Sequence, residues 1–195
     1  MLSLPPDRQR TALLIADFYA AMMGTIPHAV DRQVVEKTQR LQSAARQAGL
    51  FMCYGATVFR PGYVEISERN KTFRERKHSG QPAVTDPVQL IHPAVLPAAG
   101  EVVVGKHRVN ALYGTALDPI LRANNIDTLI ILGYATSGVV LSTTRYAADL
   151  DYRLVVVEDC CADQDPEVHN FLTQRIFPRQ ADVVSASDVI EALKA

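Results

Sequence analysis

Three places in this chain carry residues that could do chemistry together: an acid, a base and a turn rich in backbone donors. Asp17 ends the apolar run LLIA, Lys106 follows the run VVVG, and residues 134–139 follow the run LIILG. A carboxyl group can exchange a proton, an ammonium can stabilise negative charge, and N–H groups at a helix start can hold an oxyanion. Each also has an ordinary explanation, as a capping aspartate, a solvated lysine and a strand-to-helix turn. Only a fold that brings them together makes a site.

The elements that must position these residues are short apolar segments alternating with segments of helical periodicity. The expected strands are 11–16, 50–59, 101–104, 128–132, 153–157 and 182–184, and the expected helices are 34–48, 117–123 and one beginning near Ser137. Strands that are apolar on both faces and alternate with helices indicate a parallel sheet covered on two sides. Ligands of such sheets bind beyond the carboxyl ends of the strands. Asp17, Lys106 and the turn are all expected at that edge.

Residues 60–100 break this rhythm, because they are rich in Pro, Gly, Arg, Lys and Glu and show no sustained period. A connection of this length is usually a lid, a binding segment or a subunit contact. We expect it to be an excursion within one domain spanning 1–195, since 195 residues fit a single domain.

The composition argues against several classes of partner. The formal net charge is −1 and the basic residues are dispersed, so nucleic acid is not an expected partner. No segment reaches the roughly 20 apolar residues that span a bilayer, and the first ten residues do not read as a leader. We therefore expect a cytoplasmic protein without a membrane partner. Cys53, Cys160 and Cys161 are expected to be reduced, because three cysteines cannot all pair and adjacent ones are poor partners.

The segments that carry the candidate groups resemble the three signature regions of the isochorismatase-like (cysteine hydrolase) family, in the same order. These segments are LLIADF, GKHRVNALYGTALDPILR and IDTLIILGYATSGVVLSTTRYAADLDYRLVVVEDCCAD. Two further segments resemble one subgroup of the family, namely FRPGYVEISERNKTF and IFPRQAD. The resemblance covers residues 11–189. It implies a three-layer α/β fold with a six-stranded, mostly parallel sheet and helices on both faces. It also implies a homo-oligomer, either dimer or tetramer, and a non-proline cis peptide within 133–136.

Amidases of this family use an Asp, a Lys and a nucleophilic Cys, and the resemblance places these on Asp17, Lys106 and Val139. Valine has no nucleophilic atom, so the covalent route is closed at this position. Members that cleave the vinyl ether of isochorismate carry glycine there and use the Asp as an acid with water as nucleophile. Here Gly138 lies one residue earlier.

Further site residues follow from the subgroup resemblance and from nearness to strand ends. Arg60, Asn70 and Arg108 are candidates for substrate binding, with Glu65 beside them. The turn residues expected to supply oxyanion donors are Tyr134, Ala135, Thr136, Ser137 and Gly138. Nicotinamidase relatives bind metal through Asp-x-His and a further His after the second strand, but residues 51–80 contain only His78. We therefore predict no bound metal and no cofactor.

Three functions remain open from the sequence. The first is a non-covalent hydrolase of a small polar or anionic metabolite, with Asp17 as general acid or base and Lys106 stabilising charge. The second is a catalytically retired protein that keeps the pocket for binding or assembly. The third is an amidase-type hydrolase using Ser137, a residue that is also a natural helix N-cap.

Overall fold

A single six-stranded parallel sheet forms the centre of the molecule. The computed structural model describes residues 2, 4–5 and 7–194. The strands are β1 (Thr11–Ala16), β2 (Phe51–Thr57), β3 (Val102–Lys106), β4 (Thr128–Tyr134), β5 (Arg153–Ala162) and β6 (Asp182–Val184). Their order is β3-β2-β1-β4-β5-β6, and every neighbouring pair is parallel. The predicted fold class is confirmed, and β1 and β6 have the predicted bounds.

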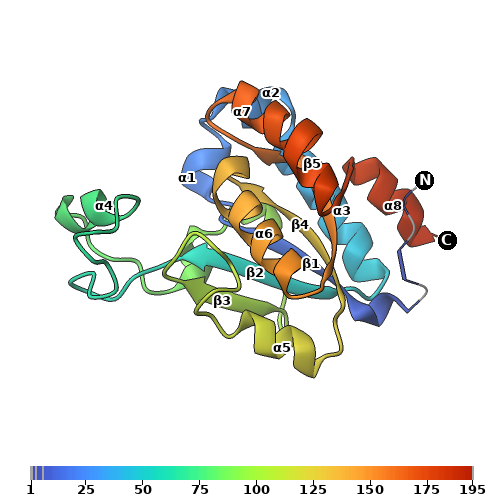
Figure 1. The fold of residues 1–195 in the computed structure, drawn as a ribbon, viewed down its shortest axis with the longest axis horizontal. Coiled ribbons are helices and arrows are strands. Elements are labelled where there is room, and N and C mark those ends of the chain that lie inside the picture. Colours follow the sequence, from blue (N-terminus) through green and yellow to red (C-terminus); the bar gives the residue numbers. More distant parts are fainter. Residues whose placement is uncertain (1, 3, 6, 195) are drawn as a thin grey trace.

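Helices cover both faces of this sheet (Figure 1). The long helices are α3 (Val34–Gln47), α5 (Leu117–Ala123), α6 (Leu141–Asp149), α7 (Pro166–Phe171) and α8 (Ala186–Lys194). Helices α3 and α8 pack together against β5. Helices α5 and α6, which connect β3 to β4 and β4 to β5, lie on the opposite face (Figure 1). The turns that follow α7 are Leu172–Ile176 and Phe177–Arg179.

Strands β2, β3 and β4 differ from their predicted bounds by one or two residues at an end, so that Lys106, expected to follow its strand, is the last residue of β3. Two larger differences concern the segment after β1 and the length of β5. Residues between β1 and α3 were expected to form a loop, but they contain the short helices α1 (Ala20–Met23) and α2 (Pro27–Asp31), which are too brief to show a period. Strand β5 runs on past Val157 through Glu158 and Asp159, two acids that interrupt the apolar pattern. Both acids are paired with cations of neighbouring helical segments, Glu158 with Arg32 and Asp159 with Lys37. Their charges are therefore tolerated within the strand.

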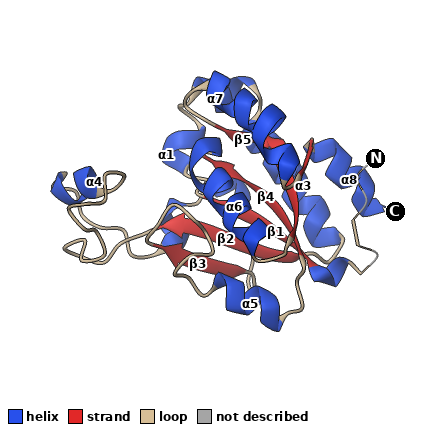
Figure 2. Ribbon diagram, in the orientation of Figure 1, coloured by secondary structure: helices blue, strands red, loops and turns tan. Residues whose placement is uncertain are grey.

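The expected excursion projects from the body of the molecule as an arm, which we define as residues 60–85 (Figure 1). Most of it is loop, with one short helix, α4 (Arg74–His78) (Figure 2). A small apolar cluster of Phe59, Tyr63 and Ile66 with Phe73 and Ala83 holds the arm together. After the arm, the chain passes through the turns Pro87–Leu90 and Pro93–Val95, and Ile91 bridges to Tyr19 just beyond β1. The base of the arm is thereby fixed beside the end of β1.

No helix in the described ranges is both long enough and apolar enough to cross a membrane.

Candidate functional site

Asp17 and Lys106 meet across the carboxyl end of β2. Asp17 directly follows β1 and Lys106 is the last residue of β3, while β2 lies between these strands and ends at Thr57. The Lys106 Nζ lies 2.6 Å from the Asp17 Oδ2 and 2.5 Å from the Thr57 Oγ1. Lys106 is fully buried and Asp17 is 8% exposed. The sheet order therefore creates an almost fully buried ion pair from residues that are far apart in the chain.

The second carboxylate oxygen of Asp17 is held by the residues around it. Asp17 Oδ1 accepts hydrogen bonds from the backbone N–H of Thr57 at 3.0 Å, from the Thr57 hydroxyl at 3.2 Å and from the Tyr19 hydroxyl. The backbone of Asp17 has φ +49°, a left-handed conformation that aspartate adopts more readily than most residues. The Lys106 Nζ also donates to the Arg108 carbonyl at 3.1 Å. Both charged groups are fixed in one orientation.

Burial controls the protonation of this group of residues. It raises the pKa of Asp17 above its usual 3.8, although the Lys106 ammonium and the hydrogen bonds from Tyr19 and Thr57 oppose the shift. Burial lowers the pKa of Lys106, against the attraction of Asp17. Burial and the Asp17 charge raise the pKa of Tyr19 well above 10, so its phenol stays a donor. A carboxyl with a raised pKa beside an amine with a lowered pKa is suited to proton transfer.

The turn after β4 passes directly beside the end of β1. A side chain at Gly133, whose φ is +149°, would place its Cβ only 1.9 Å from the Ala16 carbonyl oxygen. Only glycine permits this close approach of the two strands. The next peptide bond, Tyr134–Ala135, is cis, as the family resemblance implied. The turn is therefore positioned next to Asp17.

Ser137 has a different place from the one expected. The helical turn Thr136–Val140 begins before Ser137, and its N-cap residue is Ala135. The Ser137 N–H instead donates to the Asp163 Oδ2 at 2.7 Å. The buried carboxylate of Asp163, just after β5, therefore caps this N–H group at the start of the helix. The expectation of an N-cap serine was wrong, because the capping acid comes from another strand. Ser137 is exposed and does not line the cavity described below.

The other turn residues divide into two groups. Tyr134, Ala135 and Gly138 line the cavity. The Thr136 hydroxyl is hydrogen-bonded to the Nδ1 of His169 at 2.8 Å and points towards α7. The Gly138 N–H donates to the Ala135 carbonyl at 3.0 Å. Of the expected backbone donors, those of Ser137 and Gly138 are thus already used within the protein.

A cavity of about 680 Å³ opens beside the ion pair. Asp17, Lys106 and Val139 contribute to its wall from the sheet side, and arm residues close it from the other side. The Val139 side chain offers only methyl groups there. None of the three cysteines lines this cavity, all three are fully buried, and burial raises the pKa of Cys160 to about 12. The cavity is therefore lined by a buried ion pair and by none of the three thiols.

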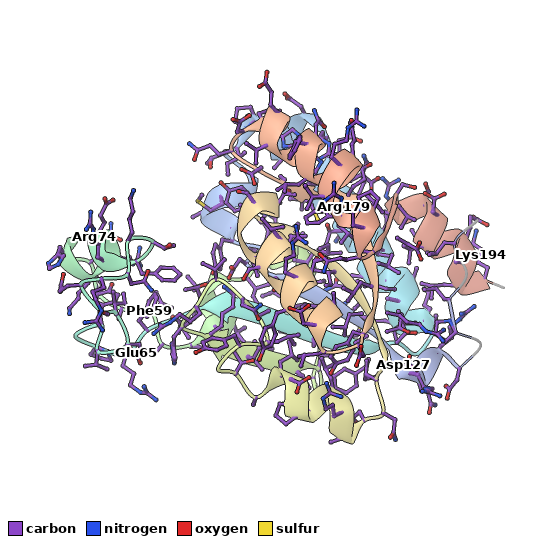
Figure 3. The ribbon with its side chains drawn as sticks, viewed as in Figure 1. Phe59, Glu65, Arg74, Asp127, Arg179 and Lys194 are labelled. Carbon is purple, nitrogen blue, oxygen red and sulfur yellow. The ribbon has the colours of Figure 1, made fainter. Side chains whose placement is uncertain are left out.

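The predicted substrate-binding residues lie outside the lining of this cavity. Arg60 is exposed and forms an ion pair with Glu65 at 2.8 Å on the arm, where Figure 3 labels Glu65. The Asn70 side-chain oxygen accepts from the N–H groups of Thr72 and Phe73, at 3.1 and 3.2 Å, and so closes a turn of the arm. Arg108 lines a separate hollow and donates to the His107 carbonyl at 2.6 Å.

The cavity residues that sequence reasoning missed include Tyr19, Thr57 and Arg76. Tyr19 and Thr57 could have been found, because one lies two residues after Asp17 and the other ends the strand between Asp17 and Lys106. Arg76 could not, because the arm follows no period. In the described part of the chain, no group of three or more His, Cys, Asp and Glu residues is arranged to hold a metal ion.

Comparison with known proteins identifies the family. The Isochorismatase domain model matches residues 11–188. The uncharacterized isochorismatase family protein YecD of Escherichia coli O157:H7 is 31% identical over 191 residues, covering 96% of this chain and 98% of that protein. Maleamate amidohydrolase of Pseudomonas putida is 27% identical over 160 residues, covering 82% and 74%. The solved structure of an isochorismatase family protein from Burkholderia thailandensis superposes with a TM-score of 0.80 at 28% identity, covering 99% and 98%. This chain therefore belongs to the isochorismatase family of hydrolases.

Proposed function

We propose that this protein hydrolyses a small amide or a related polar or anionic metabolite by direct attack of water, without a covalent intermediate. One observation carries the proposal: the cavity presents the buried Asp17–Lys106 pair beside Val139, which has no nucleophilic atom. The similarity to maleamate amidohydrolase supports an amide as the substrate class.

In this mechanism Asp17 acts first as a base and then as an acid. Ionised Asp17 takes a proton from water as the water oxygen bonds to the substrate carbonyl carbon. Protonated Asp17 then gives that proton to the leaving nitrogen as the carbon–nitrogen bond breaks. The Lys106 ammonium, 2.6 Å from the carboxylate, stabilises the ionised state before attack and again after the proton leaves. Tyr19 and Thr57 keep the carboxylate oriented throughout.

A second candidate is a ligand-binding protein without turnover. It is favoured by the N–H groups of Ser137 and Gly138, which were expected to stabilise an oxyanion but are bonded to Asp163 and Ala135. Loss of such donors typically costs a hydrolase 10²–10³-fold in rate, on the order of 3–4 kcal/mol. The two candidates differ in whether the wild-type protein releases a product.

The test is the Asp17→Asn variant, assayed for ammonia release from a panel of small primary amides that starts with maleamate. We expect turnover to be abolished while binding of the best substrate, measured by calorimetry, stays within about tenfold. The carboxamide keeps the size and hydrogen bonding of the group but cannot exchange a proton. Asp127→Asn is the matched control and should leave turnover unchanged, because Asp127 lies on the body far from the arm, paired with Arg10 (Figure 3).

The competing outcome is equally clear. A wild-type protein that binds a member of the panel yet releases no ammonia over long incubation, with unchanged binding in Asp17→Asn, would favour the ligand-binding candidate and rule out the hydrolase.

A further inference from the structure

The charges that line the cavity do not cancel. Asp17, Lys106 and Arg76 are its charged lining residues. The first two form a 2.6 Å ion pair and together contribute no net charge. Arg76 is left as the source of a positive potential inside an otherwise largely apolar space. Such a potential favours an anionic ligand.

Arg76 is also free to bind one. It lies on α4 and is exposed, and its Nη1 donates to the side-chain oxygen of Gln81 at 2.9 Å, a neutral partner. Across the described residues, no carboxylate lies within ion-pair distance of its guanidinium. Glu68 of the arm pairs with the two residues after Arg76 instead, with Lys77 at 3.0 Å and with His78 at 2.8 Å.

The surroundings of Arg76 indicate the shape of the ligand. Phe59, Tyr63 and Phe73 line the same cavity and pack on one another, with ring centroids 5.7 Å apart for Phe59 and Tyr63 and 5.4 Å for Phe59 and Phe73. Aromatic walls favour a flat, partly apolar group. A guanidinium binds a carboxylate through two parallel hydrogen bonds, which fixes its orientation as well as its position.

We propose that Arg76 binds a carboxylate of the substrate, and that the substrate class is a flat monocarboxylic acid whose hydrolysable group faces Asp17. This rests on the proposed function for the identity of the reacting group, but the carboxylate site stands on the cavity alone. Arg76 is then a specificity-determining residue, and it lies on the arm rather than on the sheet.

The test compares two probes of the same flat shape, benzoate and nitrobenzene, of which only benzoate is charged. Binding of each is measured by ligand-observed NMR titration at low salt. We expect wild-type protein to bind benzoate more tightly than nitrobenzene. Arg76→Gln should weaken benzoate about tenfold, the usual effect of losing a charged hydrogen-bonding partner, and leave nitrobenzene unchanged.

Arg74→Gln is the matched control, because it removes the same charge from the same exposed helix at a residue that does not line the cavity (Figure 3). It should change the binding of neither probe. The proposal fails if wild-type protein binds neither probe or shows no preference for benzoate. It also fails if Arg76→Gln weakens both probes equally, or if Arg74→Gln weakens benzoate as much. Neither probe needs to react, so this result is independent of whether Asp17 catalyses hydrolysis.

Discussion

Asp17 owes its proposed chemistry to the residues that hold its two oxygens. One oxygen faces Lys106, and the other accepts from Thr57 and Tyr19. A base held in one orientation loses no freedom when a water molecule binds beside it, which lowers the barrier to proton transfer. At 8% exposure, Asp17 also meets little bulk solvent that would weaken its interaction with Lys106.

The protonation of Asp17 should depend directly on Lys106. Burial raises the pKa of Asp17 and the ammonium opposes this, so Lys106→Met should raise that pKa further. If Asp17 is the base, the loss of turnover on acidification should begin at a higher pH in the variant. The measurement is an NMR titration of the ¹³C-labelled carboxyl groups, with Asp17 assigned from Asp17→Asn.

The same substitution should change how stability depends on pH. When the pKa of a carboxyl group is higher in the folded than in the unfolded state, protonation of that group stabilises the folded state. The contribution of Asp17 to the stability of Lys106→Met should therefore be fully present below the usual pKa of 3.8 and be lost as pH rises through the higher folded value. Lys37→Met, which removes a lysine paired with Asp159 at 3.4 Å, is the control and should leave the Asp17 titration in place. An unchanged or lowered pKa of Asp17 in Lys106→Met would contradict the assigned role of the lysine.

At the scale of elements, the approach of β4 to β1 depends on Gly133. Because an added Cβ would lie 1.9 Å from the Ala16 carbonyl oxygen, Gly133→Ala must push the two strands apart at the site. We expect it to lower the free energy of unfolding by at least about 2 kcal/mol and to abolish any turnover. Urea denaturation followed by circular dichroism measures the first effect.

Gly24→Ala provides the comparison for this prediction. Gly24 ends α1 with φ −89°, and a Cβ there meets nothing within 4 Å, so alanine should be tolerated. Equal stabilities for the two variants would mean that the strands separate without cost and that Gly133 does not fix the turn.

The sequence predicted the elements of the sheet far better than the contacts around the site. The strands are apolar runs that alternate with helical patterns, so their positions follow from a local pattern, and parallel strands place Asp17, Lys106 and the turn at one edge. The capping of Ser137 by Asp163 was not predictable, because the acid comes from a strand 26 residues later. The pairing of Arg60, a candidate for substrate binding, with Glu65 was not predictable either. Such local pairing leaves no pattern that distinguishes a structural arginine from a binding one.

At the scale of the whole molecule, the sheet and the arm contribute different residues to the cavity. The sheet supplies the buried Asp17–Lys106 ion pair, and the arm supplies Tyr63, Phe73 and Arg76 from an element with its own small apolar cluster. Specificity can therefore change in the arm without disturbing the pair. The homo-oligomer and the cytoplasmic location implied at the outset stay predictions.

The reactivity of the three cysteines should measure whether the sheet is folded. Cys53 lies in β2, and Cys160 and Cys161 lie in β5, all fully buried, and burial raises the pKa of each thiol. The thiolate is the reactive form, so a thiol reagent should modify the native protein only when it unfolds. We expect all three to react together, at the rate of global unfolding, and any turnover to persist until then. Labelling followed by absorbance and unfolding followed by circular dichroism, at matched urea concentrations, test this.

The Val139→Cys variant is the positive control for thiol labelling, because it adds a thiol on the cavity wall. This fourth thiol should be alkylated by iodoacetamide before the other three, since the cavity gives the reagent a path that the sheet does not. We expect little gain in amidase activity, because a thiol also needs a substrate held at attack distance and free oxyanion donors, and the N–H groups of Ser137 and Gly138 are bonded within the protein. Rapid modification of Cys53, Cys160 or Cys161 in the folded wild-type protein, with parallel loss of turnover, would place a working thiol near the site. Such a result would overturn the direct attack of water proposed for this chain.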